Sequence, residues 1–424
     1  MERVHPRGIW NLFFIEMWER FGFYIMSAVY VLYMEKALHF DDAKKGILYG
    51  MFLFFSYAFP LLGGWLGDKV LGQLKTIRIG AIMMAIGYVS LASSSSDRLV
   101  FFYLGLALIA SGTGIFKVNI SVLCGNLYRE KPELKDAGFN IYYMGVNVGA
   151  TIGPAVATIL GVMYDDYRIS FWAAACGMVL SLIFMQIGQK NLIEVDTRQS
   201  TETPIEDGLE VMEPREFRQR IWTLCVLFFI AALFWVPFYQ NGLALTLFAD
   251  RSTVAYKFLR PETYLIFNAF FILVLTPPLL ALFSRLRKSS REPSTPVKIF
   301  LGLLIMGFAM FIMVIASWMG GNSDTPIMSP MWLISTYLVI TLAEILISPM
   351  GQSYVSKVAP RKIQGLMMGG WFASTALGSL SSGIFGSFYS SLSHDKYFML
   401  LAGLSVFAAL LVLLFMKNLK RFAN

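Results

Sequence analysis

The strongest constraint on the fold of this chain is a series of apolar stretches, each long enough to cross a bilayer as a helix. A spanning helix needs roughly 20 apolar residues, and twelve stretches of the sequence meet this length. They lie at residues 9–34, 46–67, 76–95, 99–121, 137–163, 170–189, 219–249, 263–284, 297–319, 330–352, 363–389 and 397–416. The sequence therefore predicts an all-α integral membrane protein with twelve transmembrane helices.

Composition supports this class and excludes others. Charged residues make up 15% of the 424 residues, whereas a soluble domain carries about 25%, so the chain cannot cover a water-facing surface. Of the 35 Lys and Arg residues, 24 lie on the termini and alternate loops and only 9 on the remaining loops. Because positively charged loops stay in the cytoplasm, we expect both termini there. The net charge of +8 thus follows topology, and no nucleic-acid partner is expected.

One long hydrophilic segment, residues 190–218, divides the chain into six spans and six spans. We expect an N-terminal six-helix bundle at 1–189, a cytoplasmic linker at 190–218 and a C-terminal six-helix bundle at 219–424. The sequence has no Gly-rich phosphate-binding loop and no metal-ligand spacing, so we expect no cofactor and no metal. These features exclude an ATP-driven pump and indicate a secondary transporter rather than an enzyme.

Small residues recur at every fourth position in two spans. Gly145, Gly149 and Gly153 do so in the fifth span, and Gly365 and Gly369 in the eleventh. Such spacing lets helix backbones approach closely. Packing within one bundle is the preferred interpretation over a dimer face, and we expect a monomer.

Ionisable residues within the spans are few: Glu16, Glu19, Arg20, Lys117 and Glu344. Each costs roughly 2.5–3.5 kcal/mol at the middle of a membrane, and more without a partner. A charge in this environment indicates function by default. The alternative is a packing cluster whose charges neutralise one another.

Three of these charges share one helix face. Glu16, Glu19 and Arg20 stand at i, i+3 and i+4, so all three project in the same direction. Two carboxylates and one guanidinium leave one negative charge uncompensated, and neighbouring carboxylates resist double ionisation. We therefore expect this cluster to take up and release a proton, as a relay does.

The other two charges lie in different halves, Lys117 in the fourth span and Glu344 in the tenth. If the halves are structural repeats, these spans hold equivalent places in them. A cation from one half and an anion from the other suit a zwitterion, with its carboxylate toward Lys117 and its amine toward Glu344. The alternative, a direct Lys117–Glu344 ion pair that closes the bundle, stays open.

Motifs around these residues resemble the proton-dependent oligopeptide transporter (POT) family of the major facilitator superfamily, over nearly the whole chain. EMWER (16–20) is similar to the ExxER motif of the family's first helix, and GTGIFKVN (112–119) supplies the helix 4 lysine. The other matching segments are, in order, GGWLGDKVLG (63–72), FNIYYMGVNVGA (139–150), FWVPFYQNG (234–242), Asn268, AEILISPMG (343–351) and MGGWF (368–372).

The resemblance implies a fold of two six-helix bundles of the major facilitator type. It implies alternating access and proton-coupled import of di- and tripeptides across a cell membrane of the bacterial inner-membrane kind. The proton relay expected at Glu16, Glu19 and Arg20 would supply that coupling. The positions that it implies in contact with the peptide are Tyr24, Tyr57, Lys117, Asn147, Gln240, Asn268, Glu344, Ser348 and Trp371.

The sequence departs from the family pattern in three places. Phe23 stands for a tyrosine and Ser27 for an arginine, Tyr239 stands for a glutamate, and residues 190–218 are too short and polar for the two extra helices of bacterial members. In the family that arginine and glutamate pair across the outer gate, so we expect Ser27 and Tyr239 to bridge it as neutral side chains. The missing charges keep two alternatives open: a proton-coupled carrier of another organic anion or metabolite, and a membrane sensor that binds solute without transport.

Overall fold

A computed structural model describes residues 5–131, 134–196, 213–360 and 363–422. These residues are helical or lie in connections, apart from one isolated β-bridge between Thr253 and Met328. Backbone contacts divide the chain into two compact units. Unit 1 contains Met1–Phe40, Phe55–Pro204 and Lys257–Ile266; unit 2 contains Asp41–Phe54, Ile205–Tyr256 and Phe267–Asn424.

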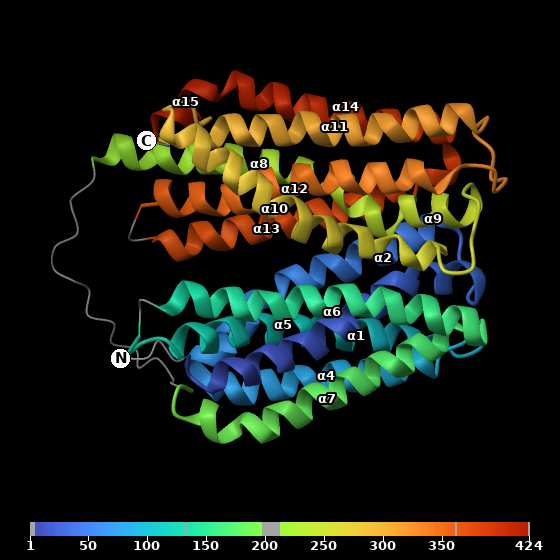
Figure 1. The fold of residues 1–424 in the computed structure, drawn as a ribbon, viewed down its shortest axis with the longest axis horizontal. Helices are drawn as coiled ribbons and strands as arrows, with labels where there is room; N and C mark the ends of the chain where they lie inside the picture. The colour runs from blue at the N-terminus through green and yellow to red at the C-terminus, as the bar shows by residue number, and fades with distance from the viewer. Residues whose placement is uncertain (1–4, 132–133, 197–212, 361–362, 423–424) are drawn as a thin grey trace. The chain divides into compact units, whose positions relative to one another are not determined.

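Unit 1 is built from long helices and three short helical segments. Its elements are α1 (Gly8–Lys36), the end of α2 (Asp42–Ala58), α3 (Pro60–Trp65), the π-helical segment η1 (Leu66–Leu71), α4 (Gln73–Ala92), α5 (Leu99–Asn126), α6 (Lys135–Tyr164), α7 (Tyr167–Ile193) and the 3₁₀ turn η4 (Pro261–Thr263). Within it, α1 packs along α6 and α7, and α4 packs along α5 and α7 (Figure 1). Helix α1 is therefore the central element of this unit.

Unit 2 begins with the first part of α2. Its further elements are α8 (Pro214–Phe238), the 3₁₀ turn η3 (Tyr239–Gly242), α9 (Ala244–Arg251), most of α10 (Leu265–Lys288), α11 (Thr295–Met319), α12 (Pro330–Val358), α13 (Gln364–Gly386), the 3₁₀ turn η6 (Tyr389–Ser391), α14 (His394–Leu414) and α15 (Met416–Arg421). Helix α11 packs along α12 and α14, and α8 packs along α13.

Among the described residues, ten helical segments are long and apolar enough to cross a membrane. Helices α1 and α13 are not among the ten, although they have 29 and 23 residues. Helix α1 carries three charges near its middle, which lower its hydropathy. The described residues therefore form an all-helical fold with many membrane-crossing segments.

Two of the predicted spans are interrupted helices. The stretch predicted at 46–67 is divided into α2, α3 and η1, and Pro60 begins α3 because proline is suited to the first turn of a helix. The stretch predicted at 219–249 is divided into α8, η3 and α9, with Pro237 and Gly242 at the break. Each still qualifies as one span by length and composition. Proline and glycine thus bend these two spans without ending them.

The glycine repeat of the fifth predicted span lines the seam between α6 and α1. A Cβ atom at Gly145 would lie 2.7 Å from the carbonyl oxygen of Phe13, and one at Gly153 would lie 2.8 Å from the backbone nitrogen of Ile25. Only glycine permits this approach. The prediction that this repeat packs helices within one bundle is confirmed. At Gly365, by contrast, no described atom lies within 4 Å of the Cβ position.

Only the two ends of the predicted linker at 190–218 belong to the described residues, because 197–212 lie outside them. At one end, Asp196 accepts backbone hydrogen bonds from Gln73 at 2.7 Å and from Leu74 at 3.3 Å. A carboxylate at a helix N-terminus satisfies free amides and faces the positive end of the helix dipole. Asp196 therefore fixes the beginning of α4.

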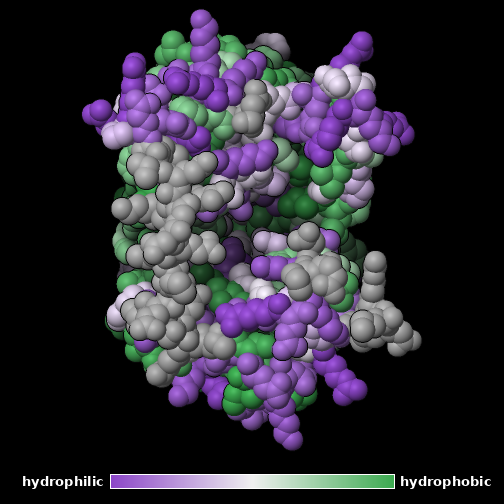
Figure 2. All heavy atoms as spheres, turned by 90° about the vertical axis from the view of Figure 1, so that its left-hand side faces the viewer, coloured by the Kyte–Doolittle hydropathy of each residue, from purple (hydrophilic) through white to green (hydrophobic). Residues whose placement is uncertain are grey.

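Polar and apolar side chains are separated along the helices of unit 2. Hydrophilic side chains gather at the end where α10 ends and α11 begins, the end that Figure 2 faces. Along the helices, exposed side chains such as Leu280 (56%) and Phe308 (59%) are apolar. This separation suits helices whose flanks face lipid and whose ends face water.

Candidate functional site

The first charged cluster lies on α1. The spacing of Glu16, Glu19 and Arg20 places them on one helix face, and their side chains are 1%, 0% and 5% exposed. Helix α6 packs against this face, since a Cβ atom at Gly149 would lie 2.9 Å from Arg20 Cβ. The structure therefore brings together the three residues predicted to couple protons and buries all of them.

Arg20 shares its donors unequally between the two carboxylates. Its Nη2 donates to Glu19 Oε1 at 2.6 Å, and its Nε donates to Glu19 Oε2, so the pair is two-pronged. Glu16 Oε1 lies 3.4 Å from the same Nε. Glu16 Oε2 is buried and has no hydrogen-bond partner among the described residues. Arg20 thus neutralises mainly the charge of Glu19, and Glu16 keeps one oxygen that can accept a proton.

Lys117 on α5 is the second charged element of unit 1. Its Nζ lies 5.6 Å from the centre of the Tyr57 ring, within the range of a cation–π interaction. No carboxylate of the described residues lies within 4.0 Å of that Nζ, although the charges of Arg20 and Glu16 act on it. Its side chain is exposed. Lys117 is therefore an accessible cation within a membrane-crossing segment.

Other residues predicted to contact a peptide in unit 1 are partly accessible. Tyr24, Tyr57 and Asn147 are half-buried. The side-chain amide of Asn147 donates to the carbonyl oxygen of Tyr143 at 3.0 Å, one turn back on α6. These three residues are therefore neither fully buried nor fully exposed.

Phe23 and Ser27, where α1 departs from the family pattern, both make contacts within α1. Ser27 Oγ donates to the carbonyl oxygen of Phe23 at 2.8 Å, so the hydroxyl serves its own helix. The ring of Phe23 lies 5.1 Å from the guanidinium carbon of Arg20, a cation–π distance. Phe23 thus supports Arg20 without adding a hydroxyl to the cluster.

In unit 2, the structure joins two residues that the sequence analysis singled out separately. The side-chain amide of Asn268 on α10 donates to Glu344 Oε2 at 2.9 Å and to Thr341 Oγ1 at 3.1 Å. Thr341, Glu344 and Ser348 stand one turn apart on α12. Asn268, Glu344 and Ser348 are half-buried. The carboxylate of Glu344 is therefore oriented by an amide and remains partly accessible.

Gln240 and Trp371 occupy the core of unit 2. The amide of Gln240 donates to the carbonyl oxygen of Ser382 at 2.8 Å and to its hydroxyl at 2.9 Å, and its carbonyl oxygen accepts from Tyr397 at 2.9 Å. Gln240 is 0% exposed and Trp371 is 1% exposed. In this structure both side chains hold helices together, and their contact with a substrate stays a prediction.

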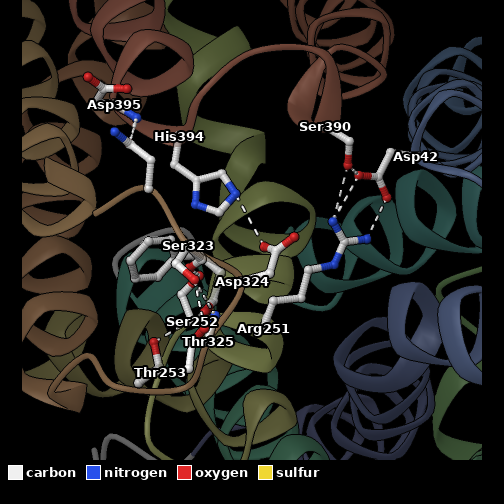
Figure 3. Close-up of polar contacts among 12 residues, drawn as sticks. Asp42, Arg251, Ser252, Thr253, Ser323, Asp324, Thr325, Ser390, His394 and Asp395 are labelled. Atoms are coloured by element: carbon white, nitrogen blue, oxygen red, sulfur yellow. Dashed lines mark hydrogen bonds and ion pairs between the residues drawn. The ribbon is translucent and has the colours of Figure 1, made fainter. Parts of the chain in front are cut away.

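A part-buried polar cluster at the beginning of α2 joins it to α9 and η6 (Figure 3). Asp42 accepts from Arg251 Nη2 at 2.7 Å and from Arg251 Nη1 at 3.0 Å. Lys45 Nζ lies 2.5 Å from Asp42 Oδ1, and Ser390 Oγ donates to Asp42 Oδ2. Asp42 is 7% exposed and Lys45 is 1% exposed. We refer to Asp42, Lys45, Arg251 and Ser390 as the α2 cluster.

Two further contacts hold the same part of α2 within unit 2. The hydroxyl of Tyr49 donates to the carbonyl oxygen of Tyr239 at 3.0 Å, and the ring of Tyr239 stacks on Trp235. A Cβ atom at Gly46 would lie 2.5 Å from the carbonyl oxygen of Gly383, so α2 and α13 touch through their backbones. The first turns of α2 are thus fixed by a glycine contact, a tyrosine and an ion-pair cluster.

The α2 cluster and Thr341 were missed from the sequence. Asp42 and Arg251 lie just outside the predicted spans 46–67 and 219–249, where charged residues are ordinary loop residues. Their separation of 209 positions leaves no local spacing to detect. Thr341 had one usable signal, because it lies three residues before Glu344 and so on the same helix face. Among the described residues, no three His, Cys, Asp or Glu side chains lie close enough to hold a metal ion.

Comparison with known proteins gives one consistent result. The sequence model of the POT family matches residues 74–207 and 209–400. The chain is 28% identical to the uncharacterized transporter YclF of Bacillus subtilis, over 98% of this chain and 95% of the relative. It is 27% identical to dipeptide and tripeptide permease A of Escherichia coli, over 89% of this chain and 83% of the relative.

Solved structures agree with this match. A crystal structure of a peptide transporter, POT, in complex with sulfate superimposes with a TM-score of 0.89 at 26% identity. The superposition covers 100% of this chain and 97% of that chain. Both the helical architecture and the sequence therefore point to the same group of membrane proteins.

Proposed function

The chain belongs to the POT family, and on this premise we propose that it carries di- and tripeptides, or peptide-like solutes, across a membrane together with protons. It is a transporter and not an enzyme. The observation that carries the proposal is the buried set of Glu16, Glu19 and Arg20, close enough to Lys117 for their charges to act on it. Burying these charges is costly, and proton coupling next to an accessible cation accounts for that cost.

We further propose the membrane arrangement that goes with this function. Helices α1 and α13 cross the membrane in addition to the ten other segments, which gives twelve spans. Residues 1–189 and 219–424 form the two six-helix bundles, joined by the linker at 190–218. Both termini are cytoplasmic, as the Lys and Arg distribution favours. The protein functions as a monomer in a membrane of the bacterial inner-membrane kind.

Proton uptake is assigned to Glu16. Its Oε2 is buried without a hydrogen-bond partner among the described residues, whereas Glu19 already satisfies the guanidinium of Arg20. A proton on Glu16 removes one negative charge from the cluster and leaves the Glu19–Arg20 pair neutral. The charge next to Lys117 then changes with each transport cycle, which links proton binding to substrate binding.

Substrate binding is assigned to both units. In unit 1, the ammonium group of Lys117, beside the Tyr57 ring, binds the peptide carboxylate, supported by Tyr24 and Asn147. In unit 2, the carboxylate of Glu344, oriented by Asn268, binds the peptide amine, with Ser348 on the same helix face. Gln240 and Trp371 shape the substrate site from the core.

Closure of the outer gate is assigned to two kinds of contact, one between neutral side chains and one between charged side chains. Ser27 and Tyr239 replace the charge pair of the family and bridge the gate without charge. We assign the charged contact to the α2 cluster instead, since Asp42 and Arg251 form a part-buried two-pronged pair. This pair holds the first turns of α2 when the outer side is closed.

One observation favours a second candidate substrate class. Ser27 removes the second cation of the family's carboxylate site, so Lys117 acts alone there. A solute whose only charged group is one carboxylate, such as an organic anion or a small metabolite, is therefore the second candidate substrate. The amine-binding pair of Asn268 and Glu344 argues for peptides.

Uptake into proteoliposomes tests the proposal. We expect labelled dialanine to accumulate when the outside is more acidic than the inside, and to stop accumulating when a protonophore removes the gradient. An excess of unlabelled tripeptide should compete, whereas acetate and N-acetylated dialanine should compete weakly. Accumulation of an organic anion in place of dialanine would favour the second candidate. Binding without any uptake would indicate a sensor and contradict the proposed function.

A further inference from the structure

A polar cavity of about 520 Å³ lies in unit 2 where α10 ends, α11 begins and α12 ends. Its charged side chains are Arg287, Glu292, Lys298 and Lys357, and Met350 adds an apolar wall. Sites for small ligands usually measure about 300–1,000 Å³, so the cavity has room for a small polar group. The proposed transport cycle uses none of these residues.

The cavity carries surplus positive charge. Glu292 accepts from Arg287 Nε at 2.6 Å and from Lys298 Nζ at 2.6 Å. Lys357 is exposed, and no carboxylate of the described residues lies within 4.0 Å of its Nζ. Three cations surround one carboxylate, which leaves two positive charges. Glu292 thus holds two cations side by side, and Lys357 is available for an external anion.

Uncharged hydrogen-bond donors also line the cavity and favour an anion there. Ser294 precedes the first residue of α11, and its Oγ is buried without a hydrogen-bond partner among the described residues. The first amides of a helix lack acceptors within the helix, and the helix dipole favours an anion there. Lys298 is 6% exposed, and its Nζ lies 4.1 Å from the centre of the Phe283 ring, so its position is fixed. The site is therefore built for a compact anion with several acceptor oxygens.

We propose that this cavity binds the phosphate group of an anionic phospholipid. Its place at the ends of three membrane-crossing segments puts it at the level of lipid headgroups. The neighbouring turns of α10 expose apolar side chains, with Leu280 56% and Leu282 49% exposed. Within the segment Pro261–Lys288, only 11% of an apolar window of 18 residues is buried. Acyl chains can lie along this surface while the phosphate enters the cavity, as in other basic pockets between transmembrane helices.

Lipid titration of the purified full-length protein in detergent tests the proposal, with bound lipid counted by native mass spectrometry and melting temperature as a second readout. We expect phosphatidylglycerol to bind and to raise the melting temperature. Phosphatidylcholine of the same chain length should not. Inorganic phosphate at the same concentration should have little effect, because it lacks the acyl chains.

Variants then assign the site. Each removed cation should weaken phosphatidylglycerol binding about fivefold, since a cation near an anionic lipid contributes about 1 kcal/mol. We therefore expect a loss of about fivefold in Lys357→Gln and of about 25-fold in the double variant Arg287→Gln with Lys357→Gln. Lys357→Arg, which keeps the charge, should retain binding. A matched control removes Lys417 and Lys420, two exposed lysines of α15 outside the cavity, by the same change to Gln.

Three results would overturn the inference. The first is an equal loss of lipid binding in the α15 control, which would indicate diffuse charge attraction. The second is stabilisation by inorganic phosphate equal to that by lipid, which would indicate a site for free anions. The third is unchanged lipid binding in the double variant Arg287→Gln with Lys357→Gln. Because the readouts are binding and melting, they do not depend on whether the protein transports peptides.

Discussion

The side-chain amide of Asn268 donates a hydrogen bond of 2.9 Å to the carboxylate of Glu344. A hydrogen bond to a charged group contributes about 1.5–3 kcal/mol, and this one also sets the direction of the carboxylate. We therefore expect Asn268→Ala to weaken binding of a peptide with a free amine about tenfold. An N-acetylated peptide, which offers no ammonium to Glu344, should lose little.

Isothermal titration with the two forms of one dipeptide measures this difference. Thr341→Val is the matched control, because it removes the second acceptor of the Asn268 amide and leaves the bond to Glu344. Its effect on affinity should be less than threefold. Equal losses for the free and acetylated peptides in Asn268→Ala would mean that Glu344 does not bind the amine.

The unequal sharing of Arg20 predicts different roles for its two carboxylates. Glu16→Gln should fold and bind peptide but lose proton-driven accumulation, because Glu19 still holds Arg20. Glu19→Gln should lower the melting temperature, since breaking a buried ion pair costs about 3–5 kcal/mol. Glu16, 3.4 Å from Arg20 Nε, lessens that cost.

Proteoliposome uptake and thermal unfolding of both variants test these roles. Exchange of pre-loaded peptide should persist in Glu16→Gln, because exchange needs no net proton movement. If Glu16→Gln accumulated peptide in response to a proton gradient as the unchanged protein does, the assignment of the proton to Glu16 would be wrong.

Lys117 supports a prediction about the other end of the peptide. Removing one partner of a desolvated charge pair costs about 2–5 kcal/mol, and the solvent exposure of the Lys117 residue favours the low end. Lys117→Ala should therefore weaken peptide binding more than about tenfold. Tyr57→Phe keeps the aromatic face beside Nζ and should have little effect, whereas Tyr57→Leu should weaken binding.

Peptides with an amidated C-terminus are the matched ligand for Lys117, because they carry no carboxylate. They should bind weakly to the unchanged protein and no more weakly to Lys117→Ala. A further loss with the amidated peptide would show that Lys117 acts through the fold and not through a carboxylate.

The sequence predicted the α1 cluster well because its information is local. Glu16, Glu19 and Arg20 lie within five residues, and helical spacing alone places them on one face. The pairing of Asn268 with Glu344 is different, since it joins α10 to α12. Each residue could be singled out, Glu344 by its charge in a span and Asn268 by family resemblance, but the bond between them could not.

Burial of individual side chains was harder to predict. Gln240 stands in a motif that marks it for substrate contact, yet its amide is satisfied by Ser382 and Tyr397 in the core. A sequence cannot distinguish an accessible amide in a span from a saturated one. Asp42 and Arg251 are the opposite case, because two residues that resemble ordinary loop charges form an ion pair whose side chains are only 6% and 16% exposed.

Glu292 gives a prediction about pH. The side chains of Arg287 and Lys298 lower the pKa of this carboxyl from its ordinary value to about 2. A lowered pKa means that ionised Glu292 stabilises the folded state above the pKa of the unfolded chain, about 4.3. That contribution is lost as the pH falls from there toward about 2. The melting-temperature difference between the unchanged protein and Glu292→Gln should therefore be constant from pH 7 to 5.

Below pH 5 the same difference should shrink. It should also be small at every pH, because ion pairs at a surface contribute little. Asp166→Asn in the connection before α7 is a comparable control, since the pKa of Asp166 is also lowered, chiefly by the hydrogen bond from Arg168. A difference for Glu292→Gln that grew on acidification would contradict the sign of this argument.

The ion pair between Asp42 and Arg251 leads to a prediction about gating. Arg251→Gln breaks a part-buried pair in which the Arg251 side chain is 16% exposed, so its cost should stay below the about 3–5 kcal/mol of a fully buried pair. Lys45 reduces the cost further because it stays 2.5 Å from Asp42. Adding Asp42→Asn should not recover the loss, since Lys45, which is 1% exposed, then loses the carboxylate of Asp42. Arg168→Gln, which breaks an exposed pair with Asp166, should cost less than about 1 kcal/mol. Melting temperatures of Arg251→Gln, Asp42→Asn and their combination form the double-mutant cycle, and Arg168→Gln is its control.

Stability alone does not make the α2 cluster a gate, so accessibility must be measured as well. Tyr49, 6% exposed and bound to the backbone of Tyr239, lies in the part of α2 that the cluster fixes. In a chain whose three native cysteines are replaced by serine, Tyr49→Cys should react slowly with a membrane-impermeant thiol reagent added outside. Arg251→Gln should speed this reaction, because the closed outer state loses its charged contact. A labelling rate that stays the same while the melting temperature falls would make the cluster a stabilising contact only. Closure would then rest on the glycine contact of α2 with α13 and on the neutral side chains of Ser27 and Tyr239.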